Sequence, residues 1–289
     1  MIPLSLVALL ALGADPSPEF YIPPDCPMRQ KPIWARQSTY DKMLAKVNAL
    51  ALPGKVPPGG PSFLYQPAFA EDKIIRLPAR PYELQPGDMV FSADGSKFWK
   101  IMHNLAGTSH PTHSMIVFAL PDGRPALLEG GPHDTLKCRI LEVTPHLASY
   151  EVEGRVWVRQ RSCPLTPMQS ARLTEFCLTA NCRAFSTRKL AIQLTPFRSR
   201  GPFRSAFMGK PRGLDEEAYY CSELVCEALV YASLLDAGST RPAATFPRDL
   251  FFGDSINLYL HRHLPAMNSS WEPPARWTGS PIDFMSESK

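Results

Sequence analysis

Three residues that lie far apart in the chain carry the groups that thiol chemistry needs. Cys221 opens a run, residues 221–232, whose apolar residues recur at helical spacing. A cysteine at a helix N-terminus meets unpaired backbone N–H groups and the positive end of the helix dipole, and both favour the nucleophilic thiolate. Such a nucleophile needs an imidazole to take its proton, and the imidazole needs an acceptor for its other nitrogen. The candidates are His113 and Glu129.

The predicted cysteine helix has two faces. Leu224 and Leu229 belong to the apolar face, whereas Glu223 and Glu227 stand four residues apart on the other face, which we expect to be solvent-exposed. Glu223 counts against activation, because a carboxylate within one turn disfavours a thiolate. A lone cysteine in a first turn is also often only a small apolar residue. A catalytic role for Cys221 therefore requires a base elsewhere in the chain.

The base and the carboxylate belong to one predicted hairpin. Residues 112–120 have the dense apolar content of a strand, and residues 121–123, Pro-Asp-Gly, have the chemistry of a three-residue hairpin loop. The register that this loop imposes places Met115 opposite Glu129. His113 and Glu129 then share a sheet face as diagonal neighbours, and a one-residue slip would separate them.

Other elements are predicted more simply. Residues 38–50 form an amphipathic helix, and residues 53–81 are too rich in proline and glycine for regular structure. Strands are expected over 138–143 and 150–160, and Thr166-Pro167 is a good start for a helix. His110 is an alternative base if the first hairpin strand begins earlier.

Composition excludes several other classes of function. The net charge of +4 is too mild to indicate nucleic-acid binding, and His133 and His146, beside turns, are expected to be solvated. Cysteine and histidine spacings do not favour a metal site, and we expect neither metal nor cofactor. The seven cysteines cannot all pair within one chain, so at least one thiol should be free: Cys26, Cys138, Cys163, Cys177, Cys182, Cys221 and Cys226.

The ends of the chain suggest export and a division into segments. Residues 2–12 form an apolar run, too short to span a bilayer, and small residues suited to signal-peptidase cleavage follow it. We therefore expect a signal peptide over 1–14 and a secreted or periplasmic protein with no transmembrane span. A proline-rich extension over 15–80, a catalytic domain over 81–255 and a tail over 256–289 complete the division.

One internal stretch is strongly basic. Between Glu175 and Asp215 there is no acidic residue. We expect a solvated insertion, with contact to an anionic polymer or membrane head group as an alternative. The basic residues are Arg183, Arg188, Lys189, Arg198, Arg200, Arg204, Lys210 and Arg212.

Five short motifs, in this order, resemble a known family. They are Pro-Gly-Asp-Met-Val-Phe from residue 86, Thr-His-Ser-Met-Ile-Val from 112, Leu-Leu-Glu-Gly from 127, Tyr-Cys-Ser-Glu-Leu-Val from 220 and Phe-Pro-Arg-Asp-Leu from 246. Together they look like the permuted papain-fold cysteine enzymes of the YiiX type, relatives of NlpC peptidases and of lecithin:retinol acyltransferase. The resemblance implies an α+β, circularly permuted papain-like fold, in which an antiparallel sheet packs against helices. It also implies Cys221 as nucleophile, His113 as base and Glu129 as third member.

The chemistry leads to one preferred function and several alternatives. We expect a cysteine peptidase or amidase that cleaves an amide bond, such as one in a cell-wall peptide, through an acyl-enzyme. A lipid deacylase or acyltransferase would use the same three residues. A noncatalytic binding module on this fold, or a structural protein in which a disulfide blocks Cys221, are the remaining alternatives.

Overall fold

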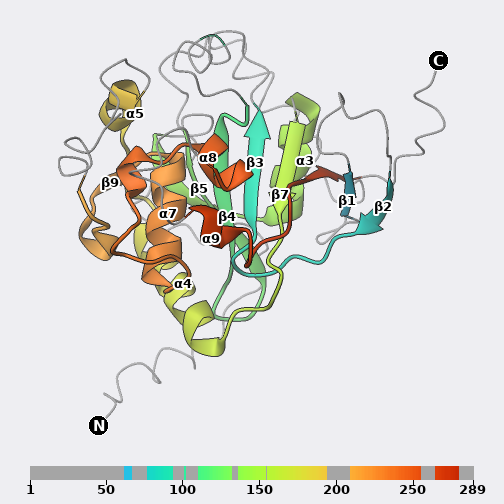
Figure 1. Ribbon diagram of the computed structural model, residues 1–289, viewed down its shortest axis with the longest axis horizontal. Helices are drawn as coiled ribbons and strands as arrows, with labels where there is room; N and C mark the ends of the chain where they lie inside the picture. Colours follow the sequence, from blue (N-terminus) through green and yellow to red (C-terminus); the bar gives the residue numbers. More distant parts are fainter. Residues whose placement is uncertain are drawn as a thin grey trace.

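A ten-stranded sheet forms the framework of the protein (Figure 1). The computed structural model describes residues 62–66, 77–93, 101, 110–131, 136–153, 155–193, 209–254 and 264–279. The strand order is β2-β1-β10-β7-β3-β4-β5-β6-β8-β9. Every neighbouring pair is antiparallel except β8 and β9, which run parallel. With its helices, this sheet makes the fold α+β.

The strands are short, and the helices of the described residues that are named below begin at residue 143 or later. The strands are β1 (Phe63–Gln66), β2 (Leu77–Pro81), β3 (Met89–Ala93), β4 (His113–Ala119), β5 (Pro125–Gly131), β6 (Lys137–Leu141), β7 (Arg155–Arg159), β8 (Ala184–Phe185), β9 (Ala218–Tyr219) and β10 (Ala275–Thr278). The helices are α3 (Val143–Glu153), α4 (Pro167–Ala180), α5 (Thr187–Gln193), α7 (Cys221–Tyr231), α8 (Pro247–Phe252) and α9 (Leu264–Met267), with 3-10 turns η3 (Gly213–Asp215) and η4 (Pro242–Ala244).

Each face of the sheet has its own core. Along β4, Ile116 and Phe118 join the cluster formed with α4, α7, α8 and α9, which lie in front of the central strands in Figure 1. Met115 and Val117 join the other cluster, which α3 covers. Alternate residues of a strand point to opposite faces, so both sides of β4 are buried.

The predicted hairpin register is confirmed. Met115 pairs with Glu129, and the N–H of Leu120 donates to the carbonyl of Arg124 at 2.8 Å. Gly123 has a φ of +86°, the left-handed conformation that closes such a loop.

The predicted absence of regular structure over 53–81 is wrong where the chain is described. β1 is a run without proline or glycine, and it pairs with β2 and with β10. β2 contains two prolines but lies at the edge of the sheet, where an N–H group can stay unpaired. The sheet therefore includes strands from the predicted extension and from the predicted tail.

The predicted strand over 150–160 is only half right. Residues 150–153 belong to α3, and β7 begins at Arg155. Val143, Leu147 and Tyr150 are buried against the sheet at helical spacing, so packing decides the conformation of this segment. The other predicted helix start is confirmed, because the N–H of Gln169 donates to the Thr166 hydroxyl.

Some predictions fall on residues outside those described. They concern the signal peptide over 1–14, the helix over 38–50 and His133. Among the described residues, none of the helices combines the length and the hydropathy needed to cross a bilayer.

Candidate functional site

The cysteine helix begins where the sequence predicted. Cys221 is the first residue of α7, after an extended Tyr220 with φ −102° and ψ 169°. It is a free thiol and is 5% exposed. The start of the helix therefore presents an unblocked sulfur beside N–H groups that have no partner within the helix.

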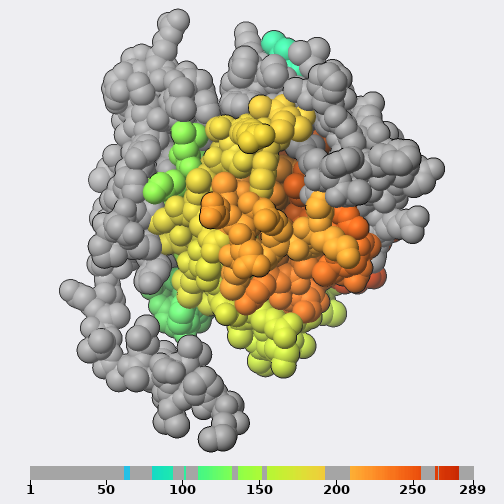
Figure 2. All heavy atoms as spheres, turned by 90° about the vertical axis from the view of Figure 1, so that its left-hand side faces the viewer, coloured from blue at the N-terminus to red at the C-terminus, as the bar shows by residue number. Residues whose placement is uncertain are grey.

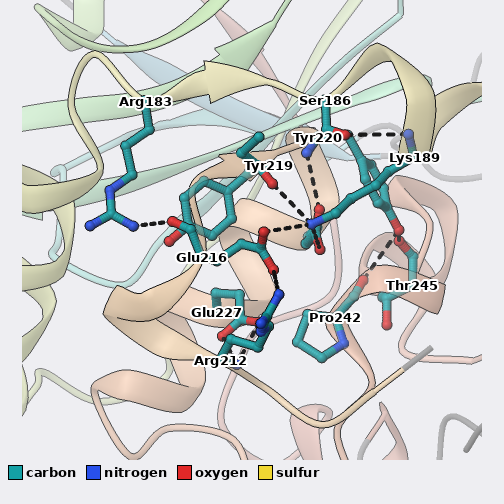
Figure 3. Close-up of polar contacts among 12 residues, drawn as sticks. Arg183, Ser186, Lys189, Arg212, Glu216, Tyr219, Tyr220, Glu227, Pro242 and Thr245 are labelled. Carbon is teal, nitrogen blue, oxygen red and sulfur yellow. Dashed lines mark hydrogen bonds and ion pairs between the residues drawn. The ribbon is translucent and has the colours of Figure 1, made fainter. Parts of the chain in front are cut away.

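The residues on either side of Cys221 are anchored to the same loop, and Figure 3 shows the contacts of Tyr220 with Pro242 and Thr245. The Tyr220 hydroxyl lies 3.2 Å from the carbonyl oxygen of Pro242 and 3.1 Å from that of Thr245. The Ser222 hydroxyl donates to the Thr245 carbonyl at 2.7 Å. These bonds fix the first turn of α7, so the position of the sulfur is set by buried contacts rather than by the helix alone.

The structure brings the three predicted residues together. His113 Nε2 lies 2.7 Å from Glu129 Oε1, and the His113 ring is also hydrogen-bonded to the Cys221 thiol. An ionised carboxylate only accepts, so Nε2 must carry a hydrogen. Because Nε2 is bound to Glu129, Nδ1 is the ring nitrogen that is left to interact with the Cys221 sulfur.

The two partners of His113 stabilise its charged form. Burial alone would lower the pKa of His113, but the hydrogen bonds and charges of Cys221 and Glu129 outweigh burial and raise that pKa to about 10. Burial likewise opposes ionisation of Glu129, yet the imidazoles of His146 and His113 hold its pKa well below the ordinary value. The site therefore favours a charged imidazole at His113 and an ionised carboxylate at Glu129.

Two residues on α3 were missed as members of the site. His146 Nε2 lies 2.6 Å from Glu129 Oε2, and the Tyr150 hydroxyl donates to Glu129 Oε1. The prediction that His146 is solvated is wrong, because its side chain is only 13% exposed. A signal existed: His146 and Tyr150 stand four residues apart, which places them on one face of a helix, but Tyr150 was assigned to a strand.

Gly131 leaves the space that the His113 ring fills. An added Cβ at Gly131 would lie 3.0 Å from His113 Cε1 and 3.3 Å from Glu129 Oε1. Gly130, on the other face, would instead press on Leu224 of α7 at 3.1 Å. The two glycines thus allow the imidazole to approach one face of β5 and the cysteine helix to approach the other.

The expected exposed face of α7 is wrong, because Glu223 and Glu227 are each only 2% exposed. Glu227 accepts hydrogen bonds from the N–H groups of Arg212 and Gly213. Glu223 Oε1 lies 2.8 Å from Lys189 Nζ. A charged face can be buried when every carboxylate finds donors, and hydrophobic spacing alone does not reveal such donors.

Lys189 connects the basic stretch to the cysteine helix. Besides Glu223, its Nζ lies 3.1 Å from Glu216 Oε1 and donates to the carbonyl of Ala218 at 2.9 Å. Figure 2 shows the α5 segment, in yellow, lying against the orange surface formed by later residues. Burial raises the pKa of Glu223 to about 7, although Lys189 opposes this shift.

Other basic residues of this stretch also meet polar groups from residues 212–227. Arg212 Nη1 lies 3.4 Å from Glu216 Oε2, and Arg183 donates to the Glu216 carbonyl (Figure 3). The expectation of a solvated insertion is therefore wrong for the part that contacts α7. Arg198, Arg200 and Arg204 lie outside the described residues.

The structure also describes the alternative base and several other cysteines. β4 begins at His113, so the alternative with His110 as base lacks the longer strand that it required. Cys182 is disulfide-bonded, whereas Cys221 and the exposed Cys163 are free thiols. No group of three or more His, Cys, Asp or Glu residues in the described part of the chain could hold a metal ion.

The chain has similar proteins among solved structures but matches no family model and no curated protein. Among solved structures, the chain is similar to the metalloprotein YiiX from Escherichia coli O157:H7, with 18% identity and a TM-score of 0.36. The match covers 52% of this chain and 67% of that one.

Proposed function

We propose that this protein is a cysteine hydrolase of the permuted papain-like type, which cleaves an amide bond through an acyl-enzyme. One observation carries the proposal: a free cysteine at a helix start contacts an imidazole whose other nitrogen is bound by a buried carboxylate. Covalent catalysis by a thiol requires a nucleophile, a base and a group that orients the base, each in contact with the next.

In the acylation step, the Cys221 thiolate attacks the carbonyl carbon of the amide. A carbon–sulfur bond forms, and the carbonyl π electrons move to oxygen. N–H groups in the first turn of α7 are suited to donate to this oxyanion. When the intermediate collapses, the carbon–nitrogen bond breaks, and the proton on His113 Nδ1 passes to the leaving amine.

In the second step, water attacks the thioester and the now neutral His113 takes a proton from it. The carbon–sulfur bond then breaks, releasing a carboxylic acid and the thiolate. Glu129 accepts a hydrogen bond from Nε2–H of His113 throughout, so the imidazole keeps one orientation in both steps. The same residues would serve an ester, and an amine or alcohol in place of water would make the enzyme an acyltransferase.

The proposal is tested by turnover of cell-wall peptides and of phospholipids, assayed side by side with the full-length protein. We expect amide cleavage that falls about 10⁴-fold or more in Cys221→Ala and in His113→Ala. Release of fatty acid without amide cleavage would move the activity to the lipid class while keeping the three residues. Wild-type turnover in both variants would overturn the proposal.

A control is available within the chain. Cys163 is an exposed free thiol, so Cys163→Ala should leave turnover unchanged. The reactivity ratio is defined here as the rate of iodoacetamide alkylation at Cys221 divided by that at Cys163, read by mass spectrometry of the two peptides. This ratio measures the nucleophilic reactivity of the Cys221 sulfur, and its measurement needs no substrate.

A further inference from the structure

We propose that His146 and Tyr150 are positioning residues, which hold Glu129 so that its Oε1 faces His113 and thereby orient the imidazole toward Cys221. The inference rests on the proposed function, because it concerns the same site. It adds α3 to the elements that build the site.

The contacts of Glu129 account for both of its oxygens. Oε1 accepts from His113 Nε2 at 2.7 Å and from the Tyr150 hydroxyl, while Oε2 lies 2.6 Å from His146 Nε2. A carboxylate held at one oxygen can still rotate about its last bond. Donors on both oxygens fix the carboxylate plane, so the position of Oε1 is defined from α3 as well as from β4.

The two α3 residues are themselves held in place. Their rings meet edge to face, with centroids 4.9 Å apart and an interplanar angle of 89°. The Tyr150 ring also lies 6.0 Å from the His113 ring. Because His146 and Tyr150 are four residues apart on one helix, α3 presents both donors to Glu129 as one rigid unit.

Burial makes these donors necessary. The Glu129 side chain is 6% exposed, and an ionised carboxylate in such a place requires several hydrogen bonds or it takes up a proton. A protonated Glu129 would no longer stabilise a charged His113. The α3 residues therefore act on the Cys221 sulfur indirectly, through the Glu129 carboxylate and the His113 imidazole.

The test uses three substitutions and measures the reactivity ratio in the full-length protein. Tyr150→Phe keeps the ring and removes the hydroxyl, and His146→Ala removes the second donor. Misplacing a catalytic group by about 1 Å costs up to ~10²-fold, so we expect the ratio to fall about tenfold or more in each variant. His146→Gln, which retains a donor, should keep the ratio within about threefold of wild type.

Tyr82→Phe is the matched control. The Tyr82 hydroxyl donates to Asp88 Oδ2 at 2.7 Å, a buried phenol–carboxylate bond in the same core cluster that does not involve His113. Losing such a bond should lower the melting temperature in both Tyr82→Phe and Tyr150→Phe, but only the latter should lower the ratio.

The outcomes separate the inference from the proposed function. A wild-type ratio at or below one, unchanged in His113→Ala, would overturn both. A high wild-type ratio that Tyr150→Phe and His146→Ala leave unchanged would overturn the inference alone and make both residues structural. Equal losses in His146→Ala and His146→Gln would also count against positioning by the Oε2 hydrogen bond.

Discussion

Two buried carboxylates lie close to the candidate nucleophile, and their surroundings differ in kind. Glu129 is bound by two imidazoles and a phenol, and the charges and hydrogen bonds of the imidazoles hold its pKa well below the ordinary value despite burial. Glu223 is bound by the Lys189 ammonium and by the N–H of Tyr220, yet burial raises its pKa to about 7. A neighbouring cation alone therefore does not decide how a buried carboxylate titrates.

The difference teaches which carboxylate serves chemistry and which serves structure. Glu129 contacts a ring that contacts the sulfur, so its charge is transmitted to the reacting atoms. Glu223 contacts Lys189 of α5 and the N–H of Tyr220 before α7, so its contacts join those two elements. Four predictions test this division.

The largest expected effect concerns the Cys221 sulfur. Glu129→Gln should lower the reactivity ratio about 100-fold, because a neutral amide cannot stabilise the His113 imidazolium. Glu223→Gln, the matched change at the other carboxylate, should stay within about threefold of wild type. Iodoacetamide alkylation of both variants measures the ratio. Similar losses in the two variants would contradict the distinction between a chemical role for Glu129 and a structural role for Glu223.

The second effect is on stability. Lys189→Met leaves Glu223 buried without its ammonium partner, and we expect a loss of about 3 kcal/mol in the free energy of unfolding. Arg188→Met, at an exposed position of the same helix, should stay within about 0.5 kcal/mol. Urea unfolding supplies both values, and equal stability of the two variants would argue against a structural role for the ion pair.

The third effect is on pH dependence, and it has opposite signs at the two carboxylates. The raised pKa of Glu223 means that the folded protein binds the proton more tightly, so the free energy of unfolding falls as pH rises from 4.5 to about 7. Glu223→Gln should remove this fall, which amounts to about 3 kcal/mol for a shift of this size. The lowered pKa of Glu129 stabilises the fold above its ordinary pKa of 4.5, and this contribution is lost as pH falls below it.

Urea unfolding at several pH values tests both statements. A stability curve for Glu223→Gln that keeps the wild-type slope between 4.5 and about 7 would show that another group titrates there. Glu129→Gln should instead reduce the loss of stability on the acid side.

The smallest effect comes from the two adjacent glycines. Gly131→Ala would push the His113 ring, and we expect the reactivity ratio to fall about tenfold, or about 1.4 kcal/mol. Gly130→Ala presses on Leu224 instead, so it should lower stability by about 1 kcal/mol while leaving the ratio nearly unchanged. The reverse pattern would mean that the imidazole lies elsewhere in solution.

The features that could be predicted from the sequence are those that neighbouring residues determine. The Pro-Asp-Gly loop sets the register that places His113 beside Glu129, and the start of the Cys221 helix follows from periodicity. Both signals lie within a few residues of the feature they determine, so no tertiary information is required.

The missed features depend on contacts between distant segments. The bond between Lys189 and Glu223 joins residues 34 positions apart, and that between His146 and Glu129 joins residues 17 apart. Helical spacing cannot show that Glu223 is buried when its donor comes from another element. The edge position of β2, which tolerates its prolines, likewise becomes visible only once the sheet is assembled.

The most direct test of the central claim is the reactivity ratio of the wild-type protein and of His113→Ala. If His113 holds the Cys221 sulfur as a thiolate, the wild-type ratio should exceed about 100 and should fall to about one or below when the imidazole is removed. A wild-type ratio near one that His113→Ala does not change would contradict the account, because the sulfur would then be an ordinary thiol.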